Sequence, residues 1–540
     1  MEQKAQGAGG ITTRGPGDAV GLSDVVHLKP QGRLEWRVAA IPVVLALGLN
    51  LLFFAAFRNH LQPDSLSYLV PAHTLVSAAA FNDAAGQPET VRTPGYPLFL
   101  AFFFALSLGV RTVVLVQHLI LVSVVGATAV ATYRVCGSRD AAVAAGIILA
   151  LDLPSIETAN TILTESVSTA FIFAVGYQAY RAATGDSRKA LWHAAAAGLL
   201  GGWVVLIRPV ALFYGVPLAL FLFIAAKPGY RWKSAVVALL AFSLFPGFWI
   251  ARNYRLTGHA TVSSVAGINM LMYRAAGALA INDPGSFDAN LVRRQDELQA
   301  VACQNLERTR SRPCSELSIS DRASYYSNLG VSIILRNPGG YTREVLRGFG
   351  NVVLGGADAM LIARNMHVLR YMVPVAALAL VGLLYWFRRD RAMLWLLLLT
   401  VGYFSVISAG AGRYSRFAAP FMVLALVGLL YWFRRDRAML WLSLLTVGYF
   451  FVVSAGAGSY SRFAVPVAEL ALVGLLYWFR RDRAMFWLLL LTVGYFSVIS
   501  AGADGYSRFR VPVMPLYAIL AGGGTAMLSD RFRARGHPSP

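Results

Sequence analysis

The stretch VAAIPVVLALGLNLLFFAAF, residues 38–57, carries no charged side chain over its whole length. A helix needs about 20 apolar residues to cross a hydrocarbon core of about 30 Å, because each residue rises about 1.5 Å. The stretch therefore predicts a membrane-spanning helix. Many later stretches show the same pattern, so the sequence predicts an all-α polytopic membrane protein.

The composition agrees with this class. Of the 540 residues, 57% are hydrophobic and 14% are charged, whereas soluble domains carry about 25% charged residues. The net charge of +21 falls mostly in short loops between apolar runs, which is the pattern of cytoplasmic loops. The expected partners are therefore membrane lipids and not nucleic acid.

Apolar runs predict where the helices lie in the first half of the chain. Residues 94–110 are apolar, but they are short and broken by proline, which favours a helix lying in or dipping into the interface. The expected spans are residues 38–57, 111–133, 141–157, 166–181, two short helices within 191–226, and 234–250.

A large polar region, residues 253–368, interrupts the apolar runs and predicts a small extracytoplasmic domain. Within it, residues 288–309 show apolar side chains at helical spacing beside a charged face. Cys303 and Cys314 lie close together in the same region, on the side where disulfides are permitted. We therefore predict a disulfide between them.

A direct repeat fills residues 378–515. The phrase LALVGLLYWFRRDRAM begins at Leu378 and recurs at Leu424 and Leu470, with a period of 46 residues. Each unit contains two apolar runs and therefore predicts a two-helix hairpin, with FRRDRA on the cytoplasmic side and YSRF outside. Because a hairpin crosses the membrane twice, each unit leaves everything after it on the same side.

The predicted organisation follows from these patterns. Residues 1–37 are polar and lack a cleavage-site pattern, which favours a cytoplasmic tail over a signal peptide. A last helix at about 511–528 brings the predicted total to 14 spans, with both termini inside. The parts are the tail 1–37, a membrane module 38–252, the extracytoplasmic domain 253–368, C-terminal helices 369–528 with the repeat, and a basic cytoplasmic tail 529–540.

Several motifs of soluble enzymes are missing from the sequence. It has no P-loop, no H-E-x-x-H, no G-x-S-x-G and no C-x-x-C. Cytosolic nucleotide chemistry therefore has no support. Charged residues at the outer membrane boundary remain as candidates for chemistry.

Two acids stand at this boundary. Asp64, in QPDSLSYL, follows the first span, and Glu165, in ILTESVS, lies between two apolar runs. The structural alternatives are that Asp64 caps a short helix and that Glu165 stabilises the first turn of its helix. An ionisable group so close to hydrocarbon is costly, which favours a functional role for Glu165.

Four arginines lie near the same boundary. Arg208, in LIRPVAL, sits inside an apolar segment and needs a partner such as a phosphate, unless it snorkels to the surface. Arg92, in VRTPGYP, is otherwise a surface arginine beside a turn. Arg252 and Arg508, taken singly, fit interfacial anchors. Together, the acids offer a base for an attacking hydroxyl and the arginines offer charge for a phosphate.

The order of these motifs resembles a known family of membrane enzymes. Asp64 lies in DSLSYL, which is followed by RTPGYPLFLAF, LTES, LIRP, ARNYRLTG, LRNPGGYTREVLRG and SRFRVPVMPLYAIL. This series resembles the bacterial GT-C glycosyltransferases of the dolichyl-phosphate-mannose-protein mannosyltransferase and aminoarabinose-transferase type. It covers about residues 38–370 and 500–525. The first motif here reads Asp-Ser where Asp-Glu is common, and the tandem hairpins are not part of the usual pattern.

The resemblance implies a GT-C-like catalytic membrane module, with its active site on the outer face of the bacterial inner membrane. Asp64 and Glu165 then match the catalytic acids of the first and second outer loops, with Glu165 orienting the acceptor or helping to bind a divalent cation. Arg92 matches a residue that approaches the donor phosphate, and Arg208, Arg252 and Arg508 are expected beside it. Tyr68, Tyr96 and Asn253, inside the same motifs, are expected near the substrate.

Two functions follow as hypotheses. The first is a glycosyltransferase of the cell envelope that moves a sugar from a polyprenyl-phosphate donor to an extracytoplasmic hydroxyl, with inversion. No metal site is predicted, and a divalent cation is left open as the one candidate cofactor. The alternative is a transporter or flippase of an anionic polyprenyl lipid. Transporters often show inverted repeats, whereas the repeats here are direct.

Overall fold

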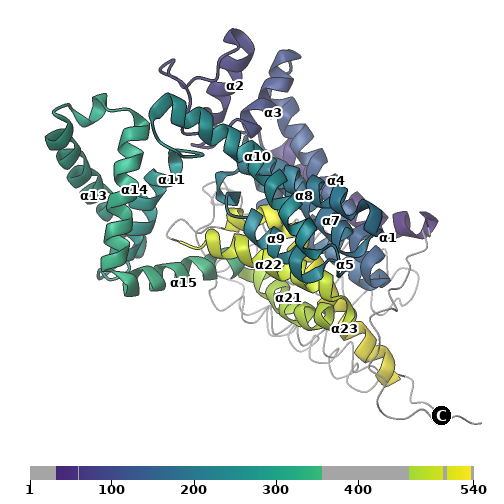
Figure 1. Cartoon of the computed structure of the whole chain (residues 1–540). Coiled ribbons are helices and arrows are strands. Elements are labelled where there is room, and N and C mark those ends of the chain that lie inside the picture. The colour runs from purple at the N-terminus through teal and green to yellow at the C-terminus, as the bar shows by residue number, and fades with distance from the viewer. Residues whose placement is uncertain (1–31, 59, 355–460, 503–506, 537–540) are drawn as a thin grey trace, which may run out of the picture.

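The computed structural model describes residues 32–58, 60–354, 461–502 and 507–536 (Figure 1). Within these ranges the secondary structure is helical, and its only β interaction is an isolated bridge between Asn82 and Pro88. The predicted all-α fold is therefore confirmed for the described part of the chain.

Several of these helices meet the requirements of a membrane span. Four are long and apolar enough: α1 (Gly32–Ala56), α4 (Val110–Cys136), α8 (Ser187–Ile207) and α10 (Arg231–Thr257). A fifth span arises if α5 (Arg139–Ala150) and α6 (Leu153–Ala159), which are bent by 51°, count as one broken span. The described residues thus contain the helices of a multi-pass membrane protein.

Other helices differ from the expected spans. The region 191–226 was expected to hold two short helices, but α8 is a full-length helix and only α9 (Gly215–Ala225) is short. The expected interfacial helix is α3 (Gly95–Ala105), and the expected span 166–181 lies within α7 (Glu165–Thr184). The total of 14 spans stays a prediction, because residues 369–460 lie outside the described ranges.

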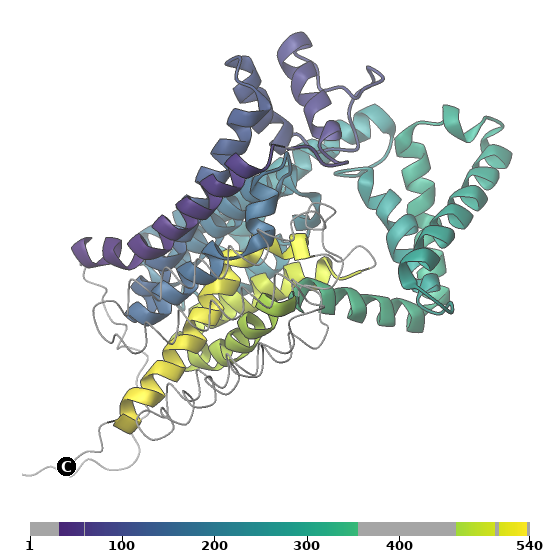
Figure 2. The ribbon, with the colours of Figure 1, turned by 180° about the vertical axis from the view of Figure 1, so that it is seen from behind.

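The membrane helices pack around a shared apolar core. In Figures 1 and 2, the C-terminal helices lie along the bundle formed by the first half of the chain. Buried side chains from α7 to α10 and from the C-terminal helices form one cluster, which includes Ile172, Phe221, Trp478 and Phe496. Segments far apart in the sequence therefore meet in one core.

The polar region forms a helical domain to one side of this bundle (Figure 1). The helix α10 runs on to Thr257, so the predicted boundary between residues 252 and 253 falls inside a helix. The predicted disulfide between Cys303 and Cys314 is present. The helices of the domain are α11 (Val265–Asn269), η2 (Met270–Ala275), α12 (Ala276–Ala280), α13 (Phe287–Arg310), η3 (Cys314–Glu316), α14 (Ile319–Arg336) and α15 (Pro338–Leu354).

The third repeat unit is a two-helix hairpin, as predicted. It contains α21 (Ser461–Arg481), which begins within the last residues of the second unit, and α22 (Arg483–Ile499), and the two helices are joined at Asp482. Asp482 caps α22 by accepting a hydrogen bond from the Met485 amide (2.9 Å), and it also accepts one from the Tyr180 hydroxyl (2.6 Å). The hairpin is therefore fastened to α7. The first unit and almost all of the second lie outside the described residues.

The chain then forms η4 (Ser507–Val513) and α23 (Met514–Gly536). The last helix was expected over residues 511–528. It begins at Met514 because a 3₁₀ turn precedes it, and it runs on into the basic tail. The predicted boundary between residues 528 and 529 therefore falls inside a helix.

Candidate active site

The loop after α1 places Asp64 between two arginines. Its Oδ1 accepts a hydrogen bond from Arg92 (2.9 Å), and its Oδ2 accepts one from Arg508 (3.3 Å), which lies 444 positions later in the chain. The helix that follows, α2 (Leu66–Ala78), has Ser65 at its N-cap without a side-chain capping bond. The Asp64 carboxylate therefore binds arginines and does not cap the helix.

The two arginines also set the charge state of Asp64. Burial raises the pKa of this carboxyl group, but the positive charges of Arg92 and Arg508 outweigh burial and hold the pKa below its usual value. The Asp64 side chain is still 38% exposed. It is therefore an ionised carboxylate that solvent and small molecules can reach.

Arg92 is held in place by groups from the start of α2. Its Nε donates to the Ser67 hydroxyl (2.8 Å) and a terminal nitrogen donates to the Tyr68 hydroxyl (3.1 Å). Its guanidinium also lies 4.5 Å from the centre of the Tyr68 ring. These contacts fix the plane of the guanidinium, so that one terminal nitrogen points at Asp64.

The loop that carries Arg92 is fastened from two directions. The Glu89 side chain accepts hydrogen bonds from the backbone amides of Val91 (2.6 Å) and Arg92 (3.0 Å). The Thr90 hydroxyl shares a hydrogen bond with Ser320 of the polar helical domain (3.0 Å). From α10, Arg252 donates to the Glu89 carbonyl oxygen (2.6 Å). The polar helical domain and α10 therefore help to place Arg92.

The second acid forms a buried ion pair. Glu165, the first residue of α7, accepts a hydrogen bond from Arg208 at the end of α8 (2.8 Å). The two side chains are only 4% and 10% exposed. Arg208 also donates to the Thr164 hydroxyl (3.1 Å). Arg208 therefore does not snorkel to the surface, and Glu165 combines a first-turn position with an ion pair.

Phe509 connects the two acidic centres. Its ring lies 5.6 Å from the guanidinium of Arg208 and 5.0 Å from that of Arg508. Asp64 and Glu165 are accompanied by three arginines, which leaves a formal excess of one positive charge (three minus two). The structure thus gathers five of the predicted site residues into one cationic cluster, which we call the Asp64–Glu165 cluster: Asp64, Arg92, Glu165, Arg208 and Arg508.

A glycine allows the two halves of this cluster to approach. Gly95 begins α3, three residues after Arg92, and a Cβ atom there would lie 2.7 Å from the carbonyl carbon of Leu206. Leu206 lies two residues before Arg208. Only a residue without a side chain permits this contact between backbones, which is a known use of glycine.

The remaining predicted site residues lie around the cluster. Tyr68 bridges Arg92 to Tyr96, whose ring it meets edge to face at 5.2 Å. Tyr96 is fully buried, and its hydroxyl donates to Gln117 (2.6 Å). Asn253 is also fully buried and donates to the carbonyl oxygen of Thr261 (2.9 Å). The contacts of Tyr96 and Asn253 are therefore with the scaffold, and a direct contact with substrate stays a prediction.

Arg252 lies apart from the two acids. Its guanidinium stacks 4.5 Å from the centre of the Trp249 ring and donates to the Glu89 carbonyl oxygen. In the described contacts it supports the loop of Arg92 and does not pair with Asp64 or Glu165. Its predicted role in binding phosphate remains untested.

Four residues of the site region escaped prediction from sequence. Gln117, in the apolar helix α4, receives the Tyr96 hydroxyl and donates to the Thr161 carbonyl oxygen (2.7 Å). Asp152 and Arg510 form a buried ion pair beside the cluster (2.9 Å). The signal for Gln117 and Asp152 was a polar side chain inside an apolar run. Ser67, which binds Arg92, gave no such signal.

The residues present do not fit a resident metal ion. In the described ranges no group of three His, Cys, Asp or Glu side chains is arranged to bind a metal. Asp64 and Glu165 are already paired with arginine cations, and a divalent cation would have to displace them. The chemistry proposed below therefore includes no step through a metal.

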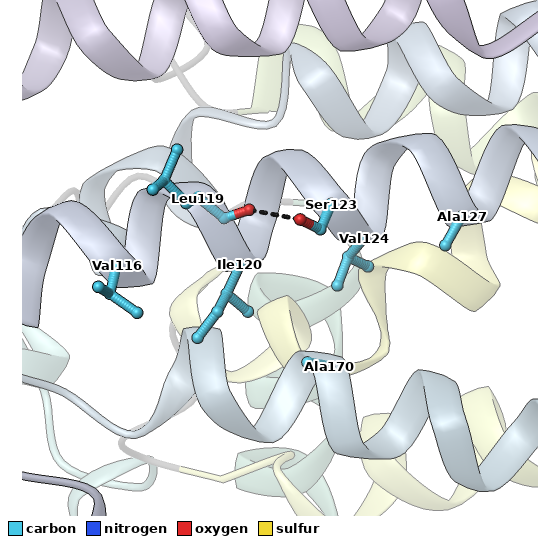
Figure 3. A pocket seen from close by; sticks show the side chains of 7 residues that line it. All are labelled: Val116, Leu119, Ile120, Ser123, Val124, Ala127 and Ala170. Carbon is cyan, nitrogen blue, oxygen red and sulfur yellow. Dashed lines mark hydrogen bonds between the residues drawn. The ribbon is translucent and has the colours of Figure 1, made fainter. Parts of the chain in front are cut away.

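An apolar groove opens between α4 and α7 (Figure 3). On the α7 side it is lined by Ala170, which follows Thr169, and the Thr169 hydroxyl donates to the Glu165 carbonyl oxygen (2.7 Å). The groove therefore begins close to the start of α7. The α4 side is lined by Val116, Leu119, Ile120, Ser123, Val124 and Ala127.

Two comparisons with known proteins find similarity to this chain. The archaeal oligosaccharyltransferase AglB from Archaeoglobus fulgidus, solved with an inhibitory peptide and a dolichol-phosphate, is similar in structure with a TM-score of 0.42 and 12% identity. The match covers 95% of this chain and 53% of that one, so this chain spans about half of its length. No curated protein matches the chain. Residues 91–250 match the family model of dolichyl-phosphate-mannose-protein mannosyltransferase, which confirms the resemblance over that segment.

Proposed function

We propose that this protein is an integral-membrane glycosyltransferase that moves a sugar from a polyprenyl-phosphate donor to an extracytoplasmic hydroxyl. The observation that carries the proposal is the Asp64 carboxylate, which is reachable from solvent and held between Arg92 and Arg508. A carboxylate supplies a base, and the two arginines supply the charge that a phosphate needs. The family match over residues 91–250 supports the transfer of a sugar.

The arginines of the cluster bind the donor phosphate in this proposal. Arginine presents a planar fork of donors that fits phosphate oxygens in pairs. The cluster carries a formal excess of one positive charge before substrate binds, and a glycosyl phosphodiester carries about one negative charge. Binding of the donor therefore neutralises the cluster.

Donor binding also activates Asp64. The phosphate competes with this carboxylate for Arg92 and Arg508, which hold the Asp64 pKa down in the free protein. Once the arginines turn toward the phosphate, the pKa of Asp64 rises and the carboxylate becomes a better base. The base is thus strengthened only when the donor is present.

The reaction is a single displacement at the anomeric carbon. Asp64 takes the proton from the acceptor hydroxyl as its oxygen attacks this carbon, and the bond from the carbon to the phosphate oxygen breaks. The electron pair leaves on the polyprenyl phosphate, whose developing charge is stabilised by the arginines. Attack from the face opposite the leaving group inverts the configuration.

Glu165 serves this reaction through Arg208. Because its carboxylate is almost completely enclosed, it is poorly placed to take a proton from an acceptor that arrives from solvent. Its ion pair instead holds Arg208 in one orientation at the end of α8. We propose that Arg208 then contacts the phosphate from the side opposite Arg92.

A lipid-linked donor suits the surroundings of the cluster. No pool of nucleotide sugars exists at the outer face of a bacterial plasma membrane, whereas the membrane concentrates a lipid substrate. The groove between α4 and α7 (Figure 3) is lined by apolar side chains, and its one hydroxyl, on Ser123, donates to the Leu119 carbonyl oxygen. This groove can accept the first isoprene units of a donor.

The proposal is tested by offering the purified protein a panel of polyprenyl-phosphate sugars and measuring released polyprenyl phosphate. We expect release with at least one sugar, dependent on an acceptor hydroxyl. A protein that instead moves labelled donor across vesicles without changing it would be a flippase. That outcome would overturn the proposed chemistry.

A further inference from the structure

The repeat presents three nearly identical segments that are able to supply an arginine to the cluster. They read YSRFAAP (414–420), YSRFAVP (460–466) and YSRFRVP (506–512). Each contains an arginine at the position of Arg508. Only the third contains a second arginine, Arg510, where the others have Ala418 and Ala464.

Arg510 binds a partner that is built to receive one cation. A terminal nitrogen of Arg510 donates to Asp152 Oδ1 (2.9 Å), and the two side chains are 9% and 3% exposed. The other carboxylate oxygen accepts hydrogen bonds from the Ser155 amide (3.1 Å) and hydroxyl (2.6 Å). Asp152 thereby caps α6 with one oxygen and binds Arg510 with the other.

This ion pair lies next to the segment that reaches the cluster. Two residues before Arg510, Arg508 extends to Asp64. One residue after it, the Val511 carbonyl oxygen accepts a hydrogen bond from the Thr169 hydroxyl on α7 (3.2 Å). The 3₁₀ turn η4 is thus fixed to α7 and to the break between α5 and α6 while it presents Arg508.

We propose that the Arg510–Asp152 pair selects the third repeat copy, among three sequence-equivalent copies, as the one that delivers an arginine to the site. The predicted hairpin topology, in which each unit crosses the membrane twice, would put all three YSRF segments on the same side. If the first or second copy occupied this place, Ala418 or Ala464 would face Asp152, and a buried carboxylate would lose its counter-charge. Buried ion pairs are known to fix register in this way.

Asp152 and Arg510 are positioning residues in this proposal. Neither is given a contact with substrate, and both act through the placement of Arg508. The functional consequence rests on the proposed glycosyl transfer, but the placement itself does not. The test therefore reads placement without any substrate.

Cross-linking of the full-length protein in membranes reports which copy is docked. One reporter joins Thr169→Cys to Val511→Cys, and the other joins Thr169→Cys to Val465→Cys, the equivalent position in the second copy. With Arg510 present, the first product should dominate. Arg510→Ala should make it the minor product, and adding Ala464→Arg to that variant should make the second product dominant.

Controls separate selection from misfolding. All variants carry Cys136→Ser to remove the free thiol, and an intact disulfide between Cys303 and Cys314 reports a folded outer domain. Arg510→Lys keeps the charge and should keep most of the first product. Arg462→Ala, which removes the second copy's arginine, should change nothing. If Arg510→Ala destabilises the protein, the yield of the first product is compared between Arg510→Lys and Arg510→Gln instead. The lysine variant should keep most of this product and the glutamine variant should lose it.

Two results would overturn the proposal. One is an undiminished product between positions 169 and 511 in folded Arg510→Ala or Arg510→Gln protein. The other is a yield of the cross-link between positions 169 and 465 that does not increase when Ala464→Arg is added to Arg510→Ala. In the transfer assay, Arg510→Ala should raise the donor KM, by up to about 10²-fold if Arg508 moves by an ångström. Absence of transfer in the wild type would defeat the proposed function and leave the cross-linking result standing.

Discussion

The two acidic centres of the site stand in different surroundings. Asp64 lies in the loop after α1, is 38% exposed and shares its oxygens between Arg92 and Arg508. Glu165 lies at the start of a packed helix, is 4% exposed and pairs with Arg208. The Asp64 carboxylate is partly exposed and binds arginines that lie far apart in the sequence. The Glu165 carboxylate is enclosed and pairs with one arginine on the neighbouring helix.

This difference separates two tasks that the sequence presented as similar. An exposed carboxylate whose partners are able to turn to another anion is suited to take up a proton and release it. An enclosed pair is suited to hold geometry, because breaking it leaves an uncompensated buried charge at a cost of about 3–5 kcal/mol. The comparison predicts that substitutions at Asp64 affect turnover and that substitutions at the Glu165 pair affect donor binding and stability.

The largest effect on turnover is expected for Asp64→Asn. Loss of one general base lowers the rate by about 10²–10⁴-fold, while the fold persists because Asp64 is partly exposed. Release of polyprenyl phosphate under saturating donor measures the change. Asp296→Asn, an exposed carboxylate on α13, is the matched control and should turn over normally. Near-normal turnover by folded Asp64→Asn protein would remove Asp64 from the chemistry.

The next effect concerns the enclosed pair. Arg208→Ala leaves Glu165 buried without its partner and should lower both stability and donor affinity, whereas Arg208→Lys keeps a charge but loses the planar fork. The unfolding temperature should fall from wild type to Arg208→Lys to Arg208→Ala, and the donor KM should rise in the same order. Identical donor titrations for wild type and Arg208→Ala would show that Arg208 does not bind the donor.

The sequence predicted the members of the cluster better than their arrangement. Charged residues beside apolar runs are conspicuous, since ionisable groups near hydrocarbon are rare. This signal favoured Glu165 and Arg208, whereas the role of Asp64 was inferred from the family resemblance. Pairing was not predictable, because Asp64 and Arg508 are 444 positions apart and meet only through tertiary packing. Asp152 carried the same signal inside the predicted span 141–157. The sequence did not predict that this span breaks between α5 and α6, where Asp152 caps α6.

Helix positions were predictable for a similar reason. Apolar runs fixed the places of α1, α4 and α10, because hydrophobicity alone determines a long span. The length of α8 and the 3₁₀ turn η4 were missed. In η4, the backbone is set by contacts of Arg508, Arg510 and Val511 with distant helices, and no local pattern encodes such contacts.

A third prediction tests how closely the two centres must approach. Gly95→Ala places a Cβ atom 2.7 Å from the Leu206 carbonyl carbon and should push the loop of Arg92 away from the end of α8. We expect a destabilisation of about 1–3 kcal/mol and a raised donor KM. Gly86→Ala, where nothing lies near the added atom but φ is positive, should affect stability and leave the donor KM unchanged. An equal rise in donor KM for both would contradict the argument.

A smaller effect is expected from pH. Since the pKa of Asp64 is held below its usual value of about 3.9, its ion pairs stabilise the fold above that value. The stabilisation is lost as the pH falls through the lowered pKa. Between about pH 5 and 7 the contribution of Asp64 to the thermal stability of wild type should therefore be constant, and below about pH 4 the stability of wild type should decline more steeply than that of Asp64→Asn. Parallel curves over that range would show that these ion pairs do not stabilise the fold.

The smallest effect is expected from deleting one whole repeat unit, residues 424–469. The new junction joins Val423 to Leu470 and keeps the phrase LALVGLLYW in register, so that α21 is rebuilt with SRFAAPFMV before Leu470 in place of SRFAVPVAE. Two crossings are lost together, and the C-terminal tail stays on its side. Arg508 and Arg510 are untouched, and if Arg510 selects the docked copy, the arginine at Asp64 remains the same one. The deletion also removes Glu469, an exposed acid on an apolar helix, which should ease insertion.

Cysteine accessibility of the C-terminal tail and the cross-link between positions 169 and 511 measure the outcome. A tail that changes sides would refute the hairpin topology. A correctly inserted protein that loses this cross-link would show that the second unit, and not only the Arg510–Asp152 pair, holds the third in place.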